Sequence, residues 1–298
     1  MQCLGRNKIS TKAARGPDAV VARIARCVRD AVDESDLDLA QIRGVGIGAP
    51  GAVEPESGRV IFAPNLSWQN VPLKKELEKE LRLPVFVEND GNICTLGVYD
   101  QEFGARPQHL IGLFLGTGIG AGLILDGKLF AGFNRTAGEV GHMVLQINGP
   151  KCGCGNRGCF EALAGRAALF RKIQAAVKAG QDTLLVDMLG PELLNMRSGD
   201  LRKAIRRGDR FIEEVVEEAA ACTGVAVANL INLLNPEVVV LGGGLIDALE
   251  SEMMGIIVKT ARRHALAGTA KGIQIVPSKL GDDAGIVGAA VYARNQTL

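Results

Sequence analysis

The chain has 298 residues, 47% of them hydrophobic, with 34 Lys and Arg against 33 Asp and Glu. This length suits one large or two medium domains, and the apolar content is ample for a buried core. A net charge of +1 creates no global field that would draw the chain to nucleic acid or anionic lipid. The composition therefore predicts a globular protein without a nucleic-acid partner.

No apolar run reaches the roughly 18 residues that a membrane span requires, and residues 1–16 lack the apolar core of a signal peptide. We therefore expect a cytoplasmic protein without a membrane partner. Thiols stay reduced in the cytoplasm, so clustered cysteines there are more typical of metal sites than of disulfides.

The first part of the chain alternates between helix and strand. Apolar residues recur at helical spacing over 17–34, and a shorter helix is indicated over 72–82. Between them, "GVGIGAPG" indicates a buried strand that runs into a tight glycine loop. A further strand, "LPVFVEND", ends on three polar residues, Glu88, Asn89 and Asp90. This alternation predicts a parallel sheet covered on both faces.

The pattern changes from Leu110 onward. The stretch "LIGLFLGTGIGAGLILDGKLF" indicates two strands around a glycine loop, followed by a turn at Asp126 and Gly127. A long helix is indicated over 210–234, "PEVVVLGGGL" is a strand that ends in glycines, and "IQIVPSKLGDDAGIVGAAVYAR" is a strand, a loop and a helix. We expect a domain boundary near residue 108.

The stretch "CGCGNRGCFEAL" brings three cysteines close together. With the preceding histidine they form H-x9-C-x-C-x4-C, from His142, Cys152, Cys154 and Cys159. One His and three Cys make a closed tetrahedral zinc set, which leaves no open position for water, so the predicted metal is structural. The alternative is three incidental buried cysteines, but the glycines between them favour a chain folded tightly around one centre.

Three glycine-rich stretches are candidates for nucleotide binding. In "GTGIGAG" the glycines lead into an apolar strand and not into a helix, so the dinucleotide-binding interpretation fails. A turn with Thr117 at its tip still offers backbone N–H groups to a phosphate, although a plain β-hairpin would look the same. "LGGGL" and "GDDAGIVGAA" suit close approach of an adenine nucleotide, or equally a strand-to-helix turn and a helix packing contact.

Several polar residues could serve a reaction. Asp90 follows a strand, where open α/β sheets place their ligands, and could accept a proton from a hydroxyl; a helix N-cap is the alternative. Glu139 and Glu161 flank the predicted metal loop and could accept hydrogen bonds from several hydroxyls, or could be surface charges. Asn65 in "APNLSW" is a weaker candidate.

Taken together, the chain resembles the ROK family of repressors, open reading frames and sugar kinases, and most closely its bacterial glucokinase-like members. The resemblance covers about Gly44 to Ala293 and rests on motifs in family order: "GIGAPG", "APNLSW", "VENDGN", "LGTGIGAG", "AGEVGHM", "CGCGNRGCFEALA", "VVVLGGG" and "LGDDAGIVGAA". It implies an actin-like (ribonuclease H-like) two-domain α/β sugar kinase fold with a structural zinc site.

The resemblance also implies how the domains are divided. An N-terminal α/β domain, 1–108, would be joined by the final helix, 284–298, and a C-terminal domain, 109–283, would carry the zinc loop and the nucleotide segments. Sugar would bind in a hinged cleft and ATP mostly on the second domain. Family members commonly form homodimers or homotetramers, and we expect the same here.

By position, Asp90 resembles the catalytic base that deprotonates the sugar 6-hydroxyl. The sugar-hydroxyl contacts would be Asn65, Asn89, Glu139, His142 and Glu161. The second phosphate loop would be Gly116, Thr117 and Gly118, and the nucleoside would lie against Gly242, Gly243 and Gly244. The implied cofactors are ATP, Mg²⁺ and structural Zn²⁺.

One departure concerns the start of the family pattern. Family members open with a strand that carries Asp-x-Gly-x-Thr-Lys, the first phosphate loop, and nothing between Met1 and Arg43 matches it. We therefore expect impaired catalysis by the chain as written. A misassigned start, a shortened chain or a non-catalytic relative would each explain the difference.

The sequence thus predicts an ATP-dependent hexose kinase, most closely a glucokinase acting on the 6-hydroxyl. A sugar-sensing binding protein or transcriptional regulator of the same family is the alternative, and a zinc-stabilised α/β module without a ligand is the third. The candidate hexoses are glucose, N-acetylglucosamine, N-acetylmannosamine, allose and fructose, and the resemblance favours glucose.

Overall fold

A computed structural model describes residues 2–297, and the chain divides into two compact units. Unit 1 comprises the chain up to Arg106, Leu129–Ala137 and the chain from Asp283, while unit 2 comprises Pro107–Lys128 and Gly138–Asp282. Each unit has its own core of buried apolar side chains. Among residues 2–297, every helix is too short or too polar to cross a membrane.

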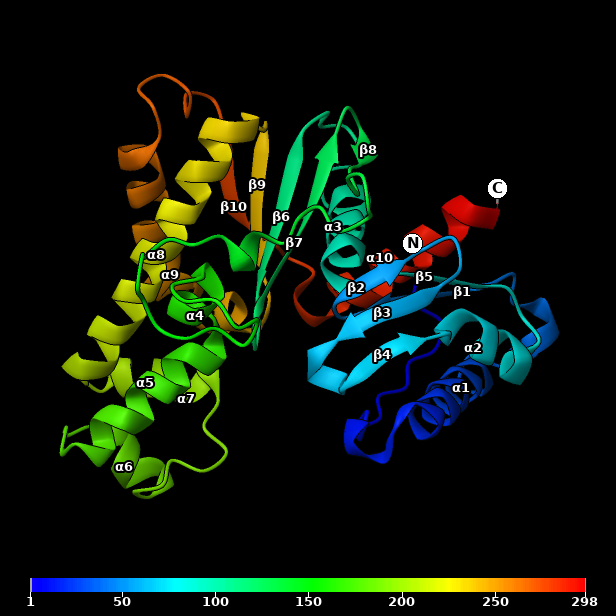
Figure 1. The fold of residues 1–298 in the computed structure, drawn as a ribbon, viewed down its shortest axis with the longest axis horizontal. Helices are drawn as coiled ribbons and strands as arrows, with labels where there is room; N and C mark the ends of the chain where they lie inside the picture. Colours follow the sequence, from blue (N-terminus) through cyan, green and yellow to red (C-terminus); the bar gives the residue numbers. More distant parts are fainter. Residues whose placement is uncertain (1, 298) are drawn as a thin grey trace. The chain divides into compact units, whose positions relative to one another are not determined.

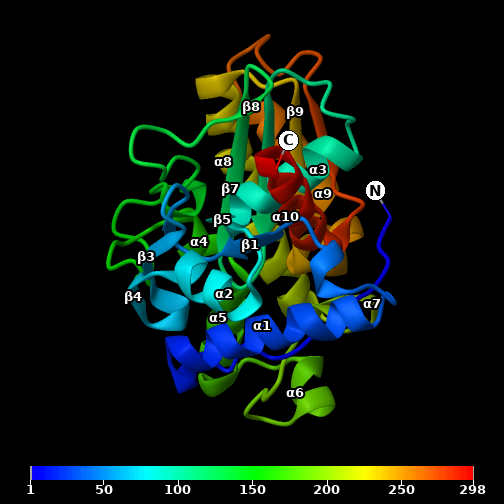
Figure 2. The ribbon, with the colours of Figure 1, turned by 90° about the vertical axis from the view of Figure 1, so that its right-hand side faces the viewer.

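Unit 1 contains two small sheets and four helices of eight or more residues among its described parts (Figures 1 and 2). Strands β1 and β5 pair in parallel, and β2, β3 and β4 form a separate antiparallel sheet. The elements are α1 Pro17–Asp33, β1 Val45–Ala49, β2 Ala52–Glu54, β3 Arg59–Ala63, β4 Trp68–Val71, α2 Leu73–Leu81, β5 Val85–Asn89, α3 Asp90–Gln101 and α10 Ala284–Thr297.

Glycines allow α3 and α10 to pack with their backbones in contact. A Cβ atom at Gly288 would lie 1.8 Å from the carbonyl oxygen of Ile93, and one at Gly97 would lie 2.5 Å from that of Ala284. The same helix packs on β1, where a Cβ at Gly46 would lie 1.9 Å from the carbonyl oxygen of Ala289. The last helix is therefore fixed to β1 and to α3, the helix that begins at Asp90.

Unit 2 is built on a mixed five-stranded sheet with the order β10-β9-β6-β7-β8. Strands β6 and β7 form an antiparallel hairpin, while β9 runs parallel to both β6 and β10. The strands are β6 Leu110–Leu115, β7 Ile119–Leu125, β8 Lys128–Leu129, β9 Val238–Gly242 and β10 Gln274–Pro277.

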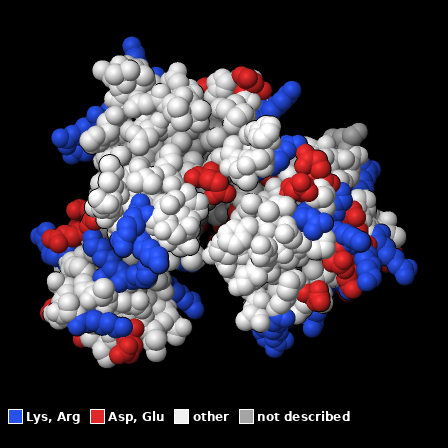
Figure 3. All heavy atoms as spheres, viewed as in Figure 1, with Lys and Arg blue, Asp and Glu red and all other residues white. Residues whose placement is uncertain are grey.

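Helices cover this sheet, and α8 and α9 pack against each other beside β9 (Figure 1). Long, largely apolar α8 begins at an N-cap, Asp209, whose carboxylate accepts the Ile212 amide at 3.1 Å. The helices are α4 Phe160–Ala164, α5 Arg166–Lys178, α6 Leu184–Leu189, α7 Ser198–Arg206, α8 Arg210–Leu234 and α9 Gly244–His264. Both acidic and basic side chains lie on the visible face of each unit (Figure 3), in keeping with the small net charge.

The predicted helices over 17–34, 72–82 and 210–234 are confirmed, as are the predicted strands and the hairpin turn. The predicted parallel sheet is confirmed in unit 1 by the pairing of β1 with β5. It has two strands in the part of the chain that the structure describes, and residues 52–71 form a separate antiparallel sheet that was not predicted. "GDDAGIVGAA" contributes a helix packing contact through Gly288, one of the two alternatives considered for it.

Candidate functional site

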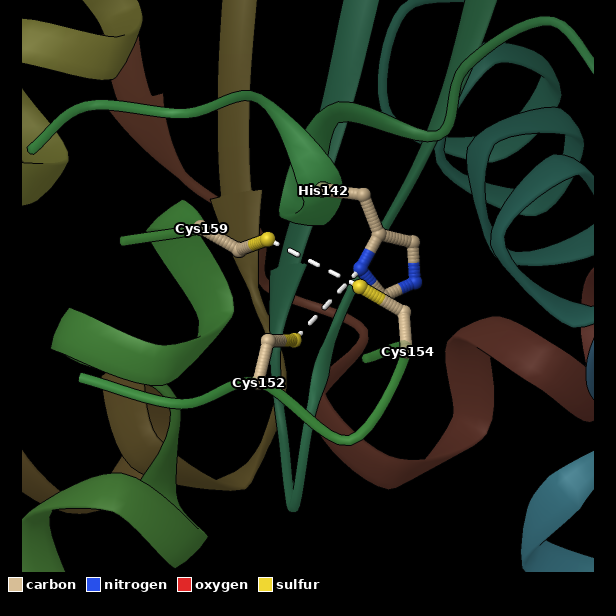
Figure 4. Close-up of side chains that lie close together, drawn as sticks. All are labelled: His142, Cys152, Cys154 and Cys159. Atoms are coloured by element: carbon tan, nitrogen blue, oxygen red, sulfur yellow. Dashed lines mark hydrogen bonds between the residues drawn. The ribbon is translucent and has the colours of Figure 1, made fainter. Parts of the chain in front are cut away.

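Four side chains of unit 2 form a compact donor cluster (Figure 4). His142 lies on a short 3-10 helix, Val140–His142, Cys159 is the N-cap of α4, and Cys152 and Cys154 lie on the loop between them. Their ligand atoms all lie within 4.8 Å of one another. The predicted clustering of these residues is confirmed.

The distances fit a tetrahedral metal ion. The Sγ atoms of Cys154 and Cys159 are 3.7 Å apart, and Cys152 Sγ lies 3.8 Å from His142 Nδ1. Zn–S bonds of about 2.3 Å in a tetrahedron place sulfur atoms roughly 3.8 Å apart. One imidazole and three thiols are a zinc donor set, and they leave no coordination position for substrate. The cluster therefore fits a structural zinc ion.

The loop reaches this shape through backbone contacts that need glycine. Gly158 has φ 72°, and a Cβ there would lie 1.6 Å from the carbonyl oxygen of Gln146. Gly155 has φ 97°, and its amide donates to the carbonyl of Cys152 at 3.1 Å. An isolated β-bridge joins Val144 to Cys159 and closes the loop at its base. Little regular secondary structure holds the ligands otherwise.

The three thiols of the cluster differ in the direction in which their pKa is shifted. Burial raises the pKa of Cys152 and raises that of Cys159 to about 12. A hydrogen bond from the Asn156 backbone lowers the pKa of the more exposed Cys154. Metal ions bind thiolates, so zinc binding at neutral pH would release protons from the two buried thiols.

The other edge of the His142 ring faces Glu139. Its Nε2 atom lies 3.8 Å from Glu139 Oε2, while Nδ1 faces the thiols. The side chains of His142 and Glu139 are 38% and 50% exposed. A metal bound at Nδ1 would fix the ring and leave Nε2 available for a polar contact.

Glu161 joins the metal loop to the β6–β7 hairpin. Its Oε2 atom accepts the Ile119 amide at 3.0 Å, and its Oε1 atom lies 3.9 Å from Cys152 Sγ. A Cβ at Gly118 would lie 2.1 Å from Oε2, so this approach needs glycine in the hairpin. Glu161 thus holds the β6–β7 hairpin through one carboxylate oxygen and places the other near the cysteine cluster.

The tip of the hairpin presents backbone donors. The Gly116 amide donates to the Gly118 carbonyl at 2.9 Å, but the amides of Thr117 and Gly118 have no hydrogen-bond partner within residues 2–297. The Gly116 and Thr117 carbonyls accept the amides of Arg166 and Ala167, both at 3.1 Å, at the start of α5. The hairpin is thereby fixed with two donors free.

A cavity of about 600 Å³ lies beside this tip in unit 2. Its lining has two arginines and no acidic residue: Thr117, Arg166, Ala167, Phe170, Asn195, Met196, Arg197, Ser198, Gly199, Gly244 and Ala248. Gly243 has φ 88°, and a Cβ there would lie 2.7 Å from the carbonyl oxygen of Leu115. The end of β9 therefore lies against the end of β6. Thr117 and Gly244, predicted to bind the nucleotide, therefore line one cavity.

In unit 1, Asn89 and not Asp90 caps α3. The Asn89 side-chain oxygen accepts the amides of Gly91 and Asn92 at 2.8 and 3.2 Å, and its nitrogen donates to the Gly51 carbonyl at 3.0 Å. Asp90 is the first residue of α3 and is exposed, with Oδ1 2.9 Å from the Gly91 amide. The N-cap alternative for Asp90 is therefore wrong.

Two other polar residues of unit 1, Asn65 and Glu88, differ in exposure. Asn65 is exposed. The strand before it passes close to Gly51, whose carbonyl accepts from Asn89, since a Cβ at Gly51 would lie only 2.1 Å from the Phe62 carbonyl oxygen. Glu88 is 2% exposed, and its Oε1 atom accepts the Asn89 amide at 2.8 Å. Glu88 is therefore buried and supports the junction between β5 and α3.

Comparison with known proteins identifies the family of this chain. A model of the ROK family matches residues 2–296. The chain belongs to the ROK family. A glucokinase from Thermotoga maritima is 37% identical over 284 residues, covering 94% of this chain and 86% of that protein.

A solved structure of a ROK family glucokinase from Streptomyces griseus, in complex with glucose and AMPPNP, matches with a TM-score of 0.86 and 33% identity. The match covers 98% of this chain and 92% of that one. A xylose repressor from Caldicellulosiruptor bescii is 38% identical over 226 residues, 74% of this chain and 56% of the repressor. The predicted α/β ROK sugar kinase fold is thus confirmed, and the His142 cluster fits the zinc site of that fold.

Sequence reasoning missed two residues of these surroundings. Arg166 was not singled out, because an arginine at the start of a helix resembles any surface charge. Glu88 was grouped with the presented polar residues at the end of β5, but its side chain is buried. This burial follows from the packing of α3 on β5 and leaves no periodic signal in the sequence.

Proposed function

We propose that this chain catalyses ATP-dependent phosphorylation of a hexose, glucose by preference, at its 6-hydroxyl. The observation that carries the proposal is the match over 98% of the chain to a ROK family glucokinase structure that contains glucose and AMPPNP. The His142 cluster and the donor-lined hairpin of unit 2 are in keeping with it.

Asp90 is the proposed general base. Its carboxylate is exposed at the first position of α3, and α3 is capped by Asn89 and backed by α10. A carboxylate held in this way can take the proton of an attacking hydroxyl. Positioning and charge neutralisation would supply most of the remaining acceleration.

The proposed sugar contacts are Asn65, Asn89, Glu139, His142 and Glu161. The support from unit 2 is the His142 ring, whose Nε2 edge stays available when Nδ1 faces the thiols. Zinc would supply rigidity to this loop and no reactive group, since four protein ligands complete its coordination. The carboxylates of Glu139 and Glu161 would accept sugar hydroxyls.

The proposed nucleotide segments are Gly116 to Gly118 and Gly242 to Gly244. Two unpartnered amides at the hairpin tip suit a phosphate group, and the end of β9 lies against the end of β6. ATP would be used as its Mg²⁺ complex, in which the ion neutralises phosphate charge. Assembly as a homodimer or homotetramer belongs to the same proposal and can be measured by light scattering.

A coupled ADP-release assay tests the function. It would compare glucose, N-acetylglucosamine, N-acetylmannosamine, allose and fructose, on the chain as given and on a chain extended upstream, which also tests the expected impairment. We expect the highest kcat/KM with glucose. Absence of sugar-dependent ADP release from both chains with every sugar would refute the proposal.

A sugar-sensing regulator is the second candidate, because a xylose repressor shares 38% identity with this chain over 226 residues. This function predicts sugar binding without turnover and DNA binding by the extended chain. Calorimetric titration with xylose and glucose, together with DNA retardation by the extended chain, separates the two functions. Sugar-dependent ADP release would exclude the purely regulatory one.

A further inference from the structure

The guanidinium of Arg166 lies between the tip of the β6–β7 hairpin and the start of α9. Its NH2 atom donates to the Thr117 hydroxyl at 2.6 Å, and its NH1 atom lies 3.7 Å from the position of a Cβ on Gly244. One guanidinium therefore touches the hairpin tip and reaches the start of α9. No carboxylate pairs with it among the ion pairs of residues 2–297.

The groups around this guanidinium are all donors or neutral. The amides of Thr117 and Gly118 have no partner in the described chain, and the cavity lining contains Arg166 and Arg197 without any acidic side chain. Gly244 contributes no side chain, so the guanidinium faces open space there. Such a combination of free amides and an unpaired guanidinium is complementary to a phosphate anion.

We propose that Arg166 is a binding residue for the phosphates of a nucleoside di- or triphosphate. This inference rests on the proposed function, since it concerns the nucleotide of that reaction. When the anion binds, the guanidinium exchanges its bond to the Thr117 hydroxyl for bonds to phosphate oxygens. The hydroxyl and the two free amides then complete the contact. Arg suits this position because its planar fork can hold two phosphate oxygens at once.

The chain offers a matched control for charge. Arg171 lies on the same helix, is exposed, and does not line the cavity. Replacing either arginine by alanine removes one positive charge from α5. A general electrostatic effect on an anionic ligand would therefore be similar for Arg166→Ala and Arg171→Ala, whereas a direct contact would appear in the first variant alone.

The experiment is calorimetric titration of the full chain with ADP and with adenosine. We expect Arg166→Ala to weaken ADP binding by roughly 10- to 100-fold, the range for loss of hydrogen bonds to a charged group. Adenosine binding should stay within about twofold, since adenosine has no phosphate. Arg171→Ala should bind both ligands as the unchanged protein does, and Arg166→Lys should recover part of the ADP affinity.

Three results would overturn the inference. These are unchanged ADP affinity in Arg166→Ala, an equal loss of adenosine affinity, and failure of the unchanged protein to bind ADP. The titration contains no sugar, so it is independent of hexose turnover. Hexose phosphorylation with unchanged ADP affinity in Arg166→Ala would remove only this inference. Absence of phosphorylation with the expected ADP losses would remove only the proposed function.

Discussion

The segments around Asp90 in unit 1 and around His142 in unit 2 are held in different ways. Asp90 stands on a strand-to-helix junction, fixed by the Asn89 cap and by the backbone contact of α3 with α10. His142 lies on a loop with little regular structure, held by glycine turns, two isolated β-bridges and a cluster of zinc-type ligands. Rigidity comes from the hydrogen-bonded fold in one case and would come from a bound zinc ion in the other.

The largest effect is expected at Asp90. The change Asp90→Asn removes the proposed base and keeps the size of the side chain, so kcat for hexose phosphorylation should fall by about 10³-fold. Sugar affinity and thermal stability should change little, because Asn89 carries the helix cap. Steady-state kinetics with a parallel sugar titration measure this split. Full activity of the variant would refute the role.

The next effect tests the packing that supports Asp90. The change Gly288→Ala would place a Cβ 1.8 Å from the Ile93 carbonyl oxygen and should lower the free energy of unfolding by about 2 kcal/mol. Gly285→Ala is the control on the same helix, since its nearest neighbour would be Cys94 Sγ at 3.7 Å. Urea denaturation of both variants measures the difference, and equal stability would contradict the close contact of the helices.

A smaller effect is expected at Glu161. The change Glu161→Ala should weaken glucose binding by about tenfold through loss of a charged hydrogen-bond partner. Glu161→Gln keeps an oxygen that can accept the Ile119 amide, so it should lose less. Titration with glucose and then with ADP separates a sugar contact from a shifted hairpin, because a shifted hairpin would weaken ADP as well. Unchanged glucose affinity in Glu161→Ala would refute the sugar contact.

Local patterns predicted much of this molecule. The His142 cluster was visible because its ligands lie within a short stretch, and α8 was visible through its length and apolar content. Helix α3 was not identified, because eight of its twelve residues are buried and its sequence has little amphipathic pattern. The β2–β3–β4 sheet was missed because its strands are short and one is bulged.

Contacts between residues that are distant in the sequence could not be predicted from local sequence patterns. The approach of Glu161 to the Ile119 amide depends on the path of the metal loop, and the contact of Arg166 with Thr117 depends on how α5 docks on the hairpin. Neither leaves a periodic signal in the sequence. Likewise, the burial of Glu88 follows from the packing of α3 on β5 and not from composition.

The comparison between the two segments is tested most directly by a glucose titration of zinc-loaded and zinc-stripped protein, with metal content measured in both samples. Our account predicts that removal of zinc weakens glucose binding by at least about tenfold, because the loop that carries His142 loses its fixed shape. Re-addition of zinc should restore the affinity. Equal glucose affinity with and without the metal would contradict the account.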